Sequence, residues 1–507
     1  MKKLIREEGS LKMDKQIKPI DRNQFQIEQD ELLYAILDRR FFKPWKQPYG
    51  LTPRDKVPKG SLELFITPTC NQKCEYCYLQ RHMHALYPMD KNNEENILKN
   101  LRALLDWVGE NRFNLPNIDL FSGEIWHVPF GLKVLDVLLE YVSQRKIFTH
   151  SITIPTNSSF IHSDTQTIEI QNRIDAFARH GVKVVISISV DGKIIEDLER
   201  PLNDKSLKRD DEFYDKLFRF AKHNGYGFHP MLAAQGAKYW IENWKWWVSM
   251  LRKYDLPIDR VMLLEVRNDD WTDEYVEDYK NFVRYLVDFT FKYHNNDFVE
   301  TLEDLFLINQ VYDTEGGPGA LLWGENMPYL PINIGDTKGF YGCTITTHMT
   351  VRLGDLAIAP CHRSAYNKYL YGYFEQDSDG KIIGVKANNP QLAVNILMLD
   401  NRRAKLGCDS CVFNPVCLST CIGQSIEANM DPLWNDPGVC KFLYTKYSFL
   451  FDLYEEKGLM DWLDKNLTNY HSGYRTWSRL LTVWKALKKE RKNAELEQFR
   501  QDFYRNC

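Results

Sequence analysis

The distribution of eleven cysteines constrains this 507-residue chain more than any other feature. They form one group near residue 70, a second group between residues 343 and 440, and one terminal residue. They are Cys70, Cys74, Cys77, Cys343, Cys361, Cys408, Cys411, Cys417, Cys421, Cys440 and Cys507. The N-terminus lacks the apolar run of a secretory signal, so we expect reduced thiols rather than a disulfide framework. Clustered thiols in such a chain usually bind metal.

Charge and hydropathy narrow the range of partners. The 65 Lys and Arg residues against 69 Asp and Glu give a net charge of −4, which provides no field to attract nucleic acid or anionic lipid. No stretch approaches the roughly 20 apolar residues that a membrane span needs. We therefore expect a soluble, cytoplasmic protein with no nucleic-acid or membrane partner.

Strand and helix patterns alternate from residue 61 onward. Apolar segments typical of strands occur at residues 61–68, 117–121, 151–156, 182–189, 227–234 and 259–268, and amphipathic helical patterns follow them. About six such alternations favour parallel strands joined by right-handed crossovers. The expected fold is an α/β partial (β/α)6 barrel, with its active site at the carboxyl ends of the strands.

The remaining segments suggest five parts. Residues 1–60 form an N-terminal extension with one helix, 61–270 the barrel, 271–340 a helical bridge, 341–450 a small Cys-rich domain, and 451–507 a helical tail. The Cys-rich part has a loop-rich composition, so bound metal would have to supply part of its stability.

The first cysteine group, Cys70-x3-Cys74-x2-Cys77, directly follows the first predicted strand. Three thiolates in one loop can hold three irons of a [4Fe–4S] cluster and leave the fourth iron open. The alternative is a zinc site completed by His82 or His84, although zinc sites usually use paired Cys-x2-Cys arms. A third hypothesis is a protein that is stabilised by zinc and binds nucleic acid through its aromatic residues. The net charge of −4 argues against it.

This loop resembles the signature of the radical S-adenosylmethionine (SAM) enzymes, Cys-x3-Cys-x-aromatic-Cys, with Tyr76 as the aromatic residue. The resemblance implies that Cys70, Cys74 and Cys77 ligate a [4Fe–4S] cluster, whose open iron the SAM amino and carboxylate groups chelate. Tyr76 would pack near the adenine. One-electron reduction would then cleave SAM to a 5′-deoxyadenosyl radical, while the protein orients the reactants and excludes water.

Further motifs resemble this family in the expected order. FSGEIW (121–126) stands where the family has Gly-Gly-Glu-Pro, so Gly123 and Glu124 would hold the SAM amine, although Ser122 and Ile125 replace the first Gly and the Pro. Three later turns, PTNSS, SISVDG and LERPL, also match. By resemblance Thr156 and Asn157 would line the SAM pocket, Ser189 would lie near the ribose, Asp191 near the cavity, and Arg200 would pair with the SAM carboxylate.

The second cysteine group, Cys408-x2-Cys411-x5-Cys417-x3-Cys421 with Cys440 beyond it, resembles the SPASM extension of radical SAM enzymes. Cys343, Gly354 and Cys361 match its upstream part, with a longer Gly-to-Cys gap than usual. The resemblance implies two auxiliary [4Fe–4S] clusters, one on Cys408, Cys411, Cys417 and Cys440, the other on Cys343, Cys361 and Cys421. The second is one ligand short, and His348 and Cys507 are candidates for that position. Two structural zinc knuckles are the alternative.

SPASM proteins mostly modify peptides or proteins. The resemblance therefore implies an oxidoreductase that abstracts hydrogen from a ribosomally made peptide and crosslinks or oxidises its residues. It would take electrons from a flavodoxin- or ferredoxin-type reductant. Residues 1–60 are short and strand-poor for a winged-helix peptide-recognition domain, so a sulfatase-maturing, formylglycine-forming enzyme or one acting on a small metabolite is the alternative. Asp191 and Glu265, with Asp269, are candidate bases, and each could instead form a structural salt bridge.

Overall fold

The computed structural model describes twelve segments and three single residues. They are 22–37, 61–79, 87–111, 115–267, 269–294, 297–298, 348–365, 369–392, 408–413, 421–429, 436–466 and 481–495, with Cys417, Asp431 and Gln498. Several sequence predictions fall outside this set: those for His82, His84, Cys343 and Cys507, and the side chain of His348. Most of residues 1–60 and 295–347 also lie outside it.

Four parallel strands begin the barrel. They are β1 (Ser61–Phe65), β2 (Asn117–Phe121), β3 (Ser151–Thr156) and β4 (Lys183–Ile188), paired in that order. Parallel bridges from Ile188 to Phe228 and from Phe228 to Val261 continue the wall. The short strands β5 (Met231–Leu232) and β6 (Leu264–Glu265) then pair in parallel. The predicted partial (β/α)6 barrel is therefore confirmed, with fifth and sixth strands shorter than expected.

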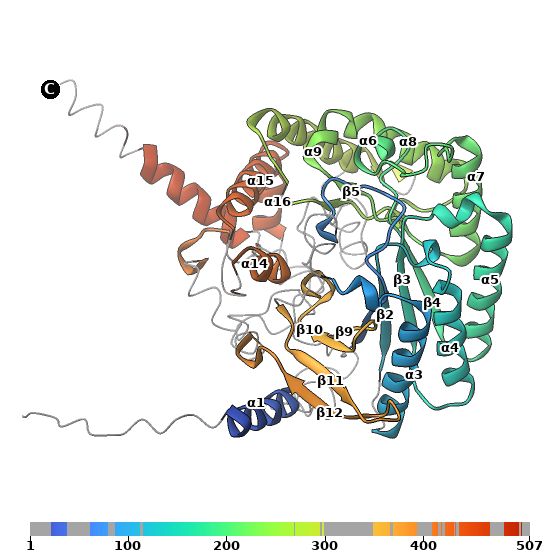
Figure 1. Ribbon diagram of the computed structural model, residues 1–507. Helices are drawn as coiled ribbons and strands as arrows, with labels where there is room; N and C mark the ends of the chain where they lie inside the picture. The colour runs from blue at the N-terminus through green and yellow to red at the C-terminus, as the bar shows by residue number, and fades with distance from the viewer. Residues whose placement is uncertain are drawn as a thin grey trace, which may run out of the picture.

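Helices between the strands cover the outer face of this wall (Figure 1). They are α3 (Glu94–Glu110), α4 (Gly131–Ser143), α5 (Asp164–Arg179), α7 (Asp211–Asn224) and α8 (Trp240–Lys253), with α9 (Asp273–Lys292) after β6, while the short α6 (Glu196–Glu199) lies in the loop that follows β4. The ring of Phe228 in the wall lies 4.6 Å from that of Phe218 on α7 and 5.0 Å from that of Trp247 on α8. Side chains that alternate with Phe228 therefore face the barrel interior.

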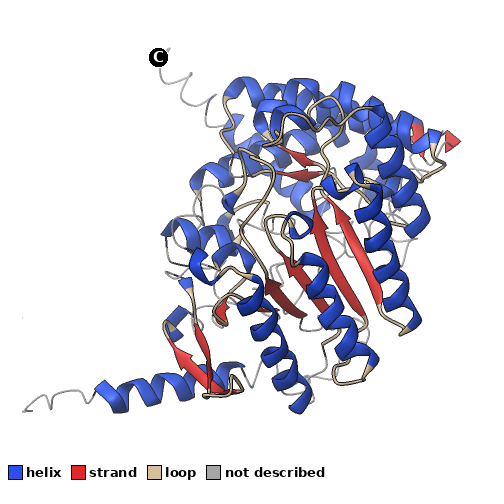
Figure 2. Cartoon of the chain, turned by 45° about the vertical axis from the view of Figure 1, so that its right-hand side comes forward, coloured by secondary structure: helices blue, strands red, loops and turns tan. Residues whose placement is uncertain are grey.

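The C-terminal part of the chain extends the same sheet. Strand β9 (His348–Arg352) pairs in parallel with the free edge of β1, and β10 (Ala357–Ala359), β11 (Gly372–Gln376) and β12 (Ile382–Ala387) follow antiparallel. The result is one sheet of eight strands in the order β12-β11-β10-β9-β1-β2-β3-β4. The strands are drawn red in Figure 2. The prediction of a loop-rich segment is therefore wrong for residues 348–387, because burial of Met349 and Val351 against the barrel stabilises strands there.

Helix α1 (Arg22–Leu37) covers the far edge of the sheet, beside β12 (Figure 1). Gln26 Nε2 donates to the Ala387 carbonyl at 3.0 Å, and the Ala387 amide donates to Asp30 Oδ1 at 2.6 Å. Leu33 is fully buried at this contact. The helix predicted in the N-terminal extension is thus present, and its side chains bind the backbone of an edge strand.

The remaining elements include two longer C-terminal helices and several short ones. They are α14 (Ile422–Asn429), α15 (Pro437–Glu456), α16 (Leu459–Asn466), a helical run at 481–495, and the hairpin of β7 (Tyr293–His294) and β8 (Asp297–Phe298). The 3-10 turns are η4 (Met89–Lys91), η5 (Ile125–His127), η6 (Ser159–His162), η7 (Ala234–Tyr239), η8 (Ile258–Arg260), η10 (His362–Ser364) and η13 (Cys408–Ser410). In the described part of the chain, no helix is long and apolar enough to cross a bilayer.

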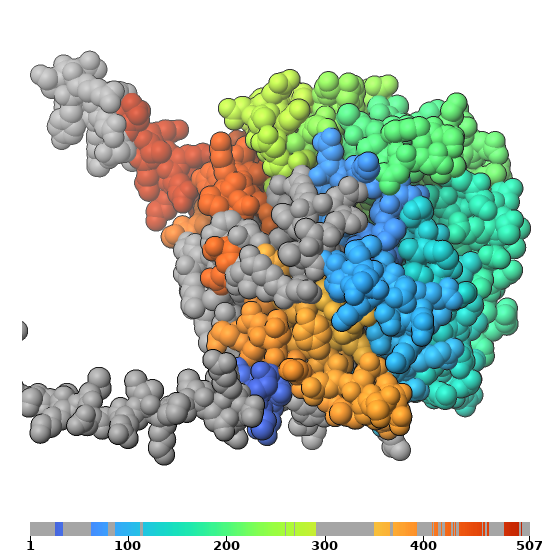
Figure 3. Space-filling view, viewed as in Figure 1, coloured from blue at the N-terminus to red at the C-terminus, as the bar shows by residue number. Residues whose placement is uncertain are grey.

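The long helix α15 docks on the barrel. Its Phe442 ring stacks on that of Trp271 at 4.3 Å and meets the Tyr279 ring of α9 at 5.2 Å. One turn later, Lys446 Nζ donates to Glu265 Oε2 of β6 at 2.8 Å. In the space-filling view, the C-terminal elements and the barrel helices lie side by side (Figure 3). The C-terminal helix is therefore packed directly against the end of the sixth barrel strand.

Candidate active site

The loop that follows β1 is joined to the turn that follows β2. The Gly123 amide donates to the Thr67 carbonyl at 2.6 Å, and the Glu124 amide donates to the Thr69 carbonyl at 2.9 Å. A Cβ on Gly123 would overlap the Thr69 oxygen and stand 2.6 Å from that of Pro68. Only glycine fits so close to the backbone of residues 68 and 69. These contacts place the turn after β2, which is predicted to hold the cofactor, directly beside the start of the cysteine loop.

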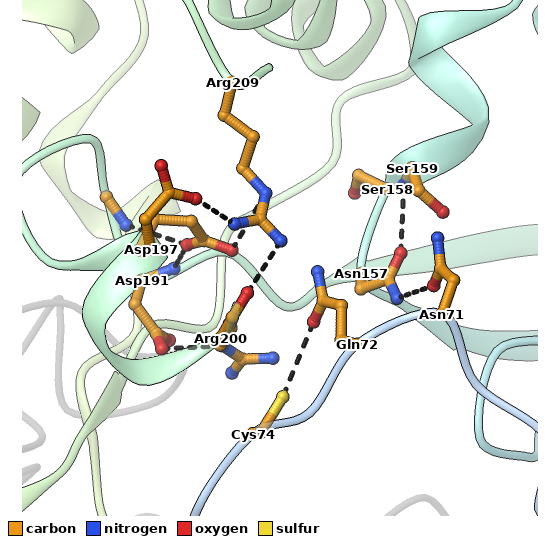
Figure 4. A network of polar contacts seen from close by, with 12 residues as sticks. Asn71, Gln72, Cys74, Asn157, Ser158, Ser159, Asp191, Asp197, Arg200 and Arg209 are labelled. Atoms are coloured by element: carbon orange, nitrogen blue, oxygen red, sulfur yellow. Dashed lines mark hydrogen bonds and ion pairs between the residues drawn. The ribbon is translucent and has the colours of Figure 1, made fainter. Parts of the chain in front are cut away.

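The three cysteines of this loop are partly buried. Asn157 Nδ2 lies 3.8 Å from Cys70 Sγ. It also donates to Asn71 Oδ1 at 2.7 Å, and Cys74 Sγ lies 3.5 Å from Gln72 Oε1 (Figure 4). Burial raises the pKa of Cys70 to about 12 and that of Cys74 higher still, and the neighbouring thiols add to both shifts. A bound cationic centre would be needed to hold these thiols as thiolates.

Three thiols of one loop can serve a cubane cluster, because each thiolate then binds a different iron. Beside the loop, Ser122 Oγ is buried without a partner among the described residues. Such a buried hydroxyl calls for a water or a ligand group.

Glu124 holds two turns together. Its carboxylate accepts hydrogen bonds from Thr156 Oγ1 at 2.9 Å, the Asn157 amide at 2.7 Å and the Trp126 amide at 3.2 Å. Full burial raises its pKa to about 7. Protein donors bind both oxygens, and the contact with the SAM amine that the resemblance implies stays a prediction. Glu124 therefore orients the turn of Thr156 and Asn157 beside the cysteine loop.

Tyr76 and Arg200, two predicted site residues from separate segments, both contact a third, Asp191. Its carboxylate accepts hydrogen bonds from Tyr76 OH at 3.0 Å, Arg200 Nε at 2.6 Å and the Met231 amide at 2.7 Å. The Arg200 guanidinium also lies over the Tyr76 ring, 5.4 Å from its centroid. Because its charge is paired and its oxygens are occupied, Asp191 is better suited to orient Arg200 and Tyr76 than to take a proton from a substrate.

The guanidinium of Arg200 has N–H donors that no described residue accepts. Only its Nε is used, and across the described residues no acceptor is bonded to its two terminal amino groups. Figure 4 shows the side chain between Asp191 and the loop residues Gln72 and Cys74. The amide of Ser189, at the end of β4, donates to the Thr156 carbonyl at 2.8 Å, which joins the β3 and β4 ends. An anion beside the cysteine loop could therefore bind the open side of Arg200.

Glu265 does not take part in the hydrogen bonds around Asp191 that are described above. Its carboxylate accepts hydrogen bonds from Lys446 Nζ at 2.8 Å and from Tyr279 OH at 2.5 Å, and both ends of the ion pair are buried. Asp269 accepts a hydrogen bond from the Ala234 amide at 2.8 Å. Glu265 thus takes part in a buried ion pair and Asp269 in a turn, and their roles as bases stay predictions.

The sequence analysis missed His362, although it directly follows Cys361. Its ring stacks on Phe121 with centroids 3.8 Å apart, immediately before the Gly123 turn. Glu63 of β1 holds it by two hydrogen bonds, one from the backbone amide and one at Nδ1, both 2.9 Å. His362 thus connects the Cys361 loop to strands β1 and β2 of the barrel. Its position beside a predicted ligand was the signal that could have identified it.

The two halves of the second cysteine group approach each other at α14. This helix begins directly after Cys421, and a Cβ on its Gly423 would stand only 2.9 Å from Cys361 Sγ. The contact places the start of α14 against the Cys361 loop. It supports the prediction that Cys361 and Cys421 share one cluster, whose further ligand Cys343 lies outside the described residues.

The other four cysteines of the group are linked by an aromatic contact. Phe413, two residues after Cys411, is buried, with its ring 4.9 Å from that of Tyr444 and 5.6 Å from that of Tyr447 on α15. Cys440 lies one turn before Tyr444 on the same helix. Phe413 therefore packs the Cys408–Cys411 loop against the helix that carries Cys440. This contact supports the prediction that Cys408, Cys411 and Cys440 share a cluster.

Comparison with known proteins gives distant structural likenesses. No family model and no curated protein matches the sequence. The chain is similar to the structure of native anSMEcpe with bound AdoMet, at 16% identity and a TM-score of 0.48, over 78% of this chain and 98% of that one. It is also similar to Streptococcus suis SuiB bound to S-adenosylmethionine, at 15% identity and a TM-score of 0.42, over 82% and 87%. At this distance, the function has to be argued from the chain's own residues.

Proposed function

We propose that this chain is a radical SAM enzyme with a SPASM-type C-terminal part. The observation that carries the proposal is the position of Cys70, Cys74 and Cys77, in a loop at the carboxyl end of β1 that is hydrogen-bonded to the turn after β2. Active sites of β/α barrels form at that end of the strands. The open side of Arg200 lies at the same end, where it can receive the carboxylate of SAM.

The chain's own residues would bind and orient the cofactors. Bound there, a [4Fe–4S] cluster would supply the electron that cleaves SAM to a 5′-deoxyadenosyl radical. The three thiolates would hold the cluster, Arg200 would bind the SAM carboxylate, and Ser189 would lie near the ribose. Glu124 would keep the Thr156–Asn157 turn in place beneath the cofactor.

The second cysteine group would hold two auxiliary [4Fe–4S] clusters. The contact of Gly423 with Cys361 and the packing of Phe413 on α15 support the two predicted ligand sets. His362, stacked on Phe121, would lie between the SAM site and the Cys361 site. Electrons left after hydrogen abstraction could then pass to a nearby centre.

We infer a peptide substrate from the SPASM resemblance. The reaction would remove hydrogen from a residue of a ribosomally made peptide and end in a crosslink or an oxidised side chain. A formylglycine-forming enzyme of the sulfatase-maturing type, or one acting on a small metabolite, is the second candidate. A flavodoxin- or ferredoxin-type protein would supply the electrons.

Metal analysis after anaerobic reconstitution tests the cofactor proposal. About twelve irons per chain, with matching sulfide, are expected for three clusters. Replacing Cys70, Cys74 and Cys77 by Ala should leave about eight irons and abolish the formation of 5′-deoxyadenosine under dithionite. The matched triple variant at Cys408, Cys411 and Cys417 should also lose about four irons but should still cleave SAM. Stoichiometric zinc without sulfide or SAM cleavage would overturn the proposal.

Mass spectrometry of offered peptides tests the substrate class. Synthetic peptides that contain Cys, Ser and aromatic residues are incubated with the reconstituted enzyme, SAM and dithionite. We expect a peptide to lose two hydrogen atoms per event in a reaction that produces 5′-deoxyadenosine. Stimulation of SAM cleavage by small metabolites alone, with every peptide unchanged, would favour the second candidate.

A further inference from the structure

Two buried carboxyl groups lie beside Arg200 and differ in one respect. Asp191 and Glu199 are both fully buried. Asp191 accepts three hydrogen bonds, from Tyr76, Arg200 and the Met231 amide. Neither oxygen of Glu199 has a donor anywhere in the described residues. One carboxyl group is therefore solvated by the protein and its neighbour is not.

Among the described residues, the cation that acts on Glu199 is Arg200, which already pairs with Asp191. A Cβ on Gly236 of η7 would overlap Glu199 Oε1 and lie 3.0 Å from its Cδ, so the carboxyl occupies the space left by that glycine. The nearby indole N–H of Trp240 on α8 is also buried without a partner in the described part of the chain. The titratable and charged groups that face Glu199 are Asp191, Arg200, Glu196 and Tyr76.

The cations near Glu199 are already paired. Arg200 binds Asp191, and buried Arg209 binds Asp197 at 2.7 Å and lies 3.7 Å from Glu196. Ionisation of Glu199 would place an unsolvated negative charge beside that of Asp191, at a large cost in free energy. Burial, with the Asp191 charge as a further cause, raises the pKa of Glu199 well above its usual value. A protonated Glu199 can instead donate its O–H to the Asp191 carboxylate.

We propose that Asp191 and Glu199 form an acid pair with divided roles: Asp191 carries the charge that orients Arg200 and Tyr76, and Glu199 carries a proton. The proton keeps a second carboxylate from competing for Arg200. The terminal amino groups of Arg200 then remain available to an anionic group at the cysteine loop. The part of this inference that concerns the ligand rests on the proposed function, because the anion is taken to be the SAM carboxylate. Both acids are positioning residues that act through Arg200.

The same chemical change at the two acids tests the proposal. Asp191→Asn removes the charge that orients Arg200, whereas Glu199→Gln keeps the neutral state and shape of the protonated acid. SAM binding to the anaerobically reconstituted protein, without reductant, is measured by calorimetry at pH 7.5. We expect Asp191→Asn to raise the Kd about tenfold or more, and Glu199→Gln to change it by less than about threefold. Equal effects of the two variants would overturn the proposal. Glu212→Gln, an exposed change on α7, is the control.

A spectroscopic measurement separates the acid pair from the SAM proposal. At pH 8.5, the infrared difference between the wild-type chain and Glu199→Gln should contain the C=O stretch of one protonated carboxyl group. This readout requires no SAM, so the band would be present even if the wild-type chain failed to bind SAM. In that case the acid pair would stand, and the proposed function would fail. Absence of the band would overturn the acid pair.

A second variant keeps the test decisive if Asp191→Asn folds poorly. The double variant Asp191→Asn/Arg200→Gln removes both members of the buried pair, so its Tm should exceed that of Asp191→Asn. SAM affinity should remain weak in the double variant, because the anion-binding group is gone. A double variant that binds SAM as tightly as the wild-type chain would contradict the role of Arg200 and, with it, that of Asp191.

Discussion

At the residue scale, acidic side chains at the mouth of the barrel differ in how the protein solvates them. Glu124 accepts hydrogen bonds from Thr156 and from two backbone amides, Asp191 pairs with Arg200, and Glu199 has no donor in the described residues. All three are fully buried. Burial favours the neutral form, and donors and cations favour the charged form. The balance at each position therefore decides which acid is charged.

Glu124 should make stability depend on pH. Its pKa is about 7 in the folded chain and about 4.5 when exposed, so the folded state binds more protons between these values. The free energy of unfolding should then fall as the pH rises from about 4.5 to about 7, by up to about 3 kcal/mol. Glu196, also raised to about 7 by burial, adds to the same slope. Glu124→Gln should reduce the slope in denaturant titrations at pH 5, 6 and 7, and an unchanged slope would contradict this assignment.

Gly123 should tolerate no side chain. In Gly123→Ala, the new methyl group would overlap the Thr69 carbonyl and push the turn after β2 away from the cysteine loop. We expect a loss of about 1–3 kcal/mol in unfolding free energy and fewer irons retained by the first site. The matched control is Gly384→Ala on β12, where the nearest atom would be 4.0 Å away. Equal stability and iron content in the two variants would refute this account.

At the element scale, short contacts between helices and loops bring distant cysteines together. Helix α14 approaches the Cys361 loop at Gly423, and α15 receives Phe413 between its aromatic residues. Both contacts join segments that the sequence separates. The second cysteine group is therefore organised by packing of its helices as well as by any bound metal.

Gly423→Ala tests the contribution of α14. Its methyl group would stand 2.9 Å from Cys361 Sγ, closer than a carbon and a sulfur atom can pack. We expect the reconstituted variant to lose about four irons while it still cleaves SAM at the first site. Iron analysis and a 5′-deoxyadenosine assay on the same preparation measure both effects, with Gly384→Ala as the control. Full iron content in the variant would show that the contact of α14 with Cys361 is not needed to form the cluster.

At the scale of the whole molecule, β9 and α15 join the C-terminal part to the barrel. Strand β9 pairs with β1 along its full length, and Lys446 of α15 forms a buried ion pair with Glu265 of β6. Tyr279 donates a further hydrogen bond to the same carboxylate. A buried pair of this kind is sensitive to the loss of either member, because the other charge then remains unpaired.

A double-mutant cycle on Glu265 and Lys446 tests this connection. Glu265→Gln and Lys446→Met should each lower the free energy of unfolding by about 3–5 kcal/mol. The double variant should be more stable than the sum of the single losses predicts, because Glu265 and Lys446 no longer leave each other unpaired. Arg267, whose Nε lies 4.0 Å from Glu265 Oε2, loses that contact equally in Glu265→Gln and in the double variant, so this loss cancels in the cycle. Denaturant unfolding of the four proteins measures the coupling. Additive losses would mean that the two side chains do not interact in solution.

Much of the barrel, and the meeting of several residues of the candidate site, could be predicted from the sequence. The alternating strand and helix patterns predicted the six barrel strands in order, and the loop motifs predicted that Tyr76, Asp191 and Arg200 belong to one site. Those signals are local: apolar periodicity and cysteine spacing depend on neighbouring residues. The prediction failed for residues 348–387, because β9 is stabilised by pairing with β1, which is far away in the chain.

The sequence by itself determined where the thiols of the first loop stand relative to the strands. Only the tertiary structure decided the state of the acids. Asp191 and Glu199 are chemically alike and eight residues apart in the sequence, yet one is paired with a cation and the other lacks a donor in the described residues. Glu265, a candidate base in the sequence, is the buried partner of Lys446. The charge of a carboxyl group depends on the solvent, donors and cations around it, and folding brings these together from distant segments.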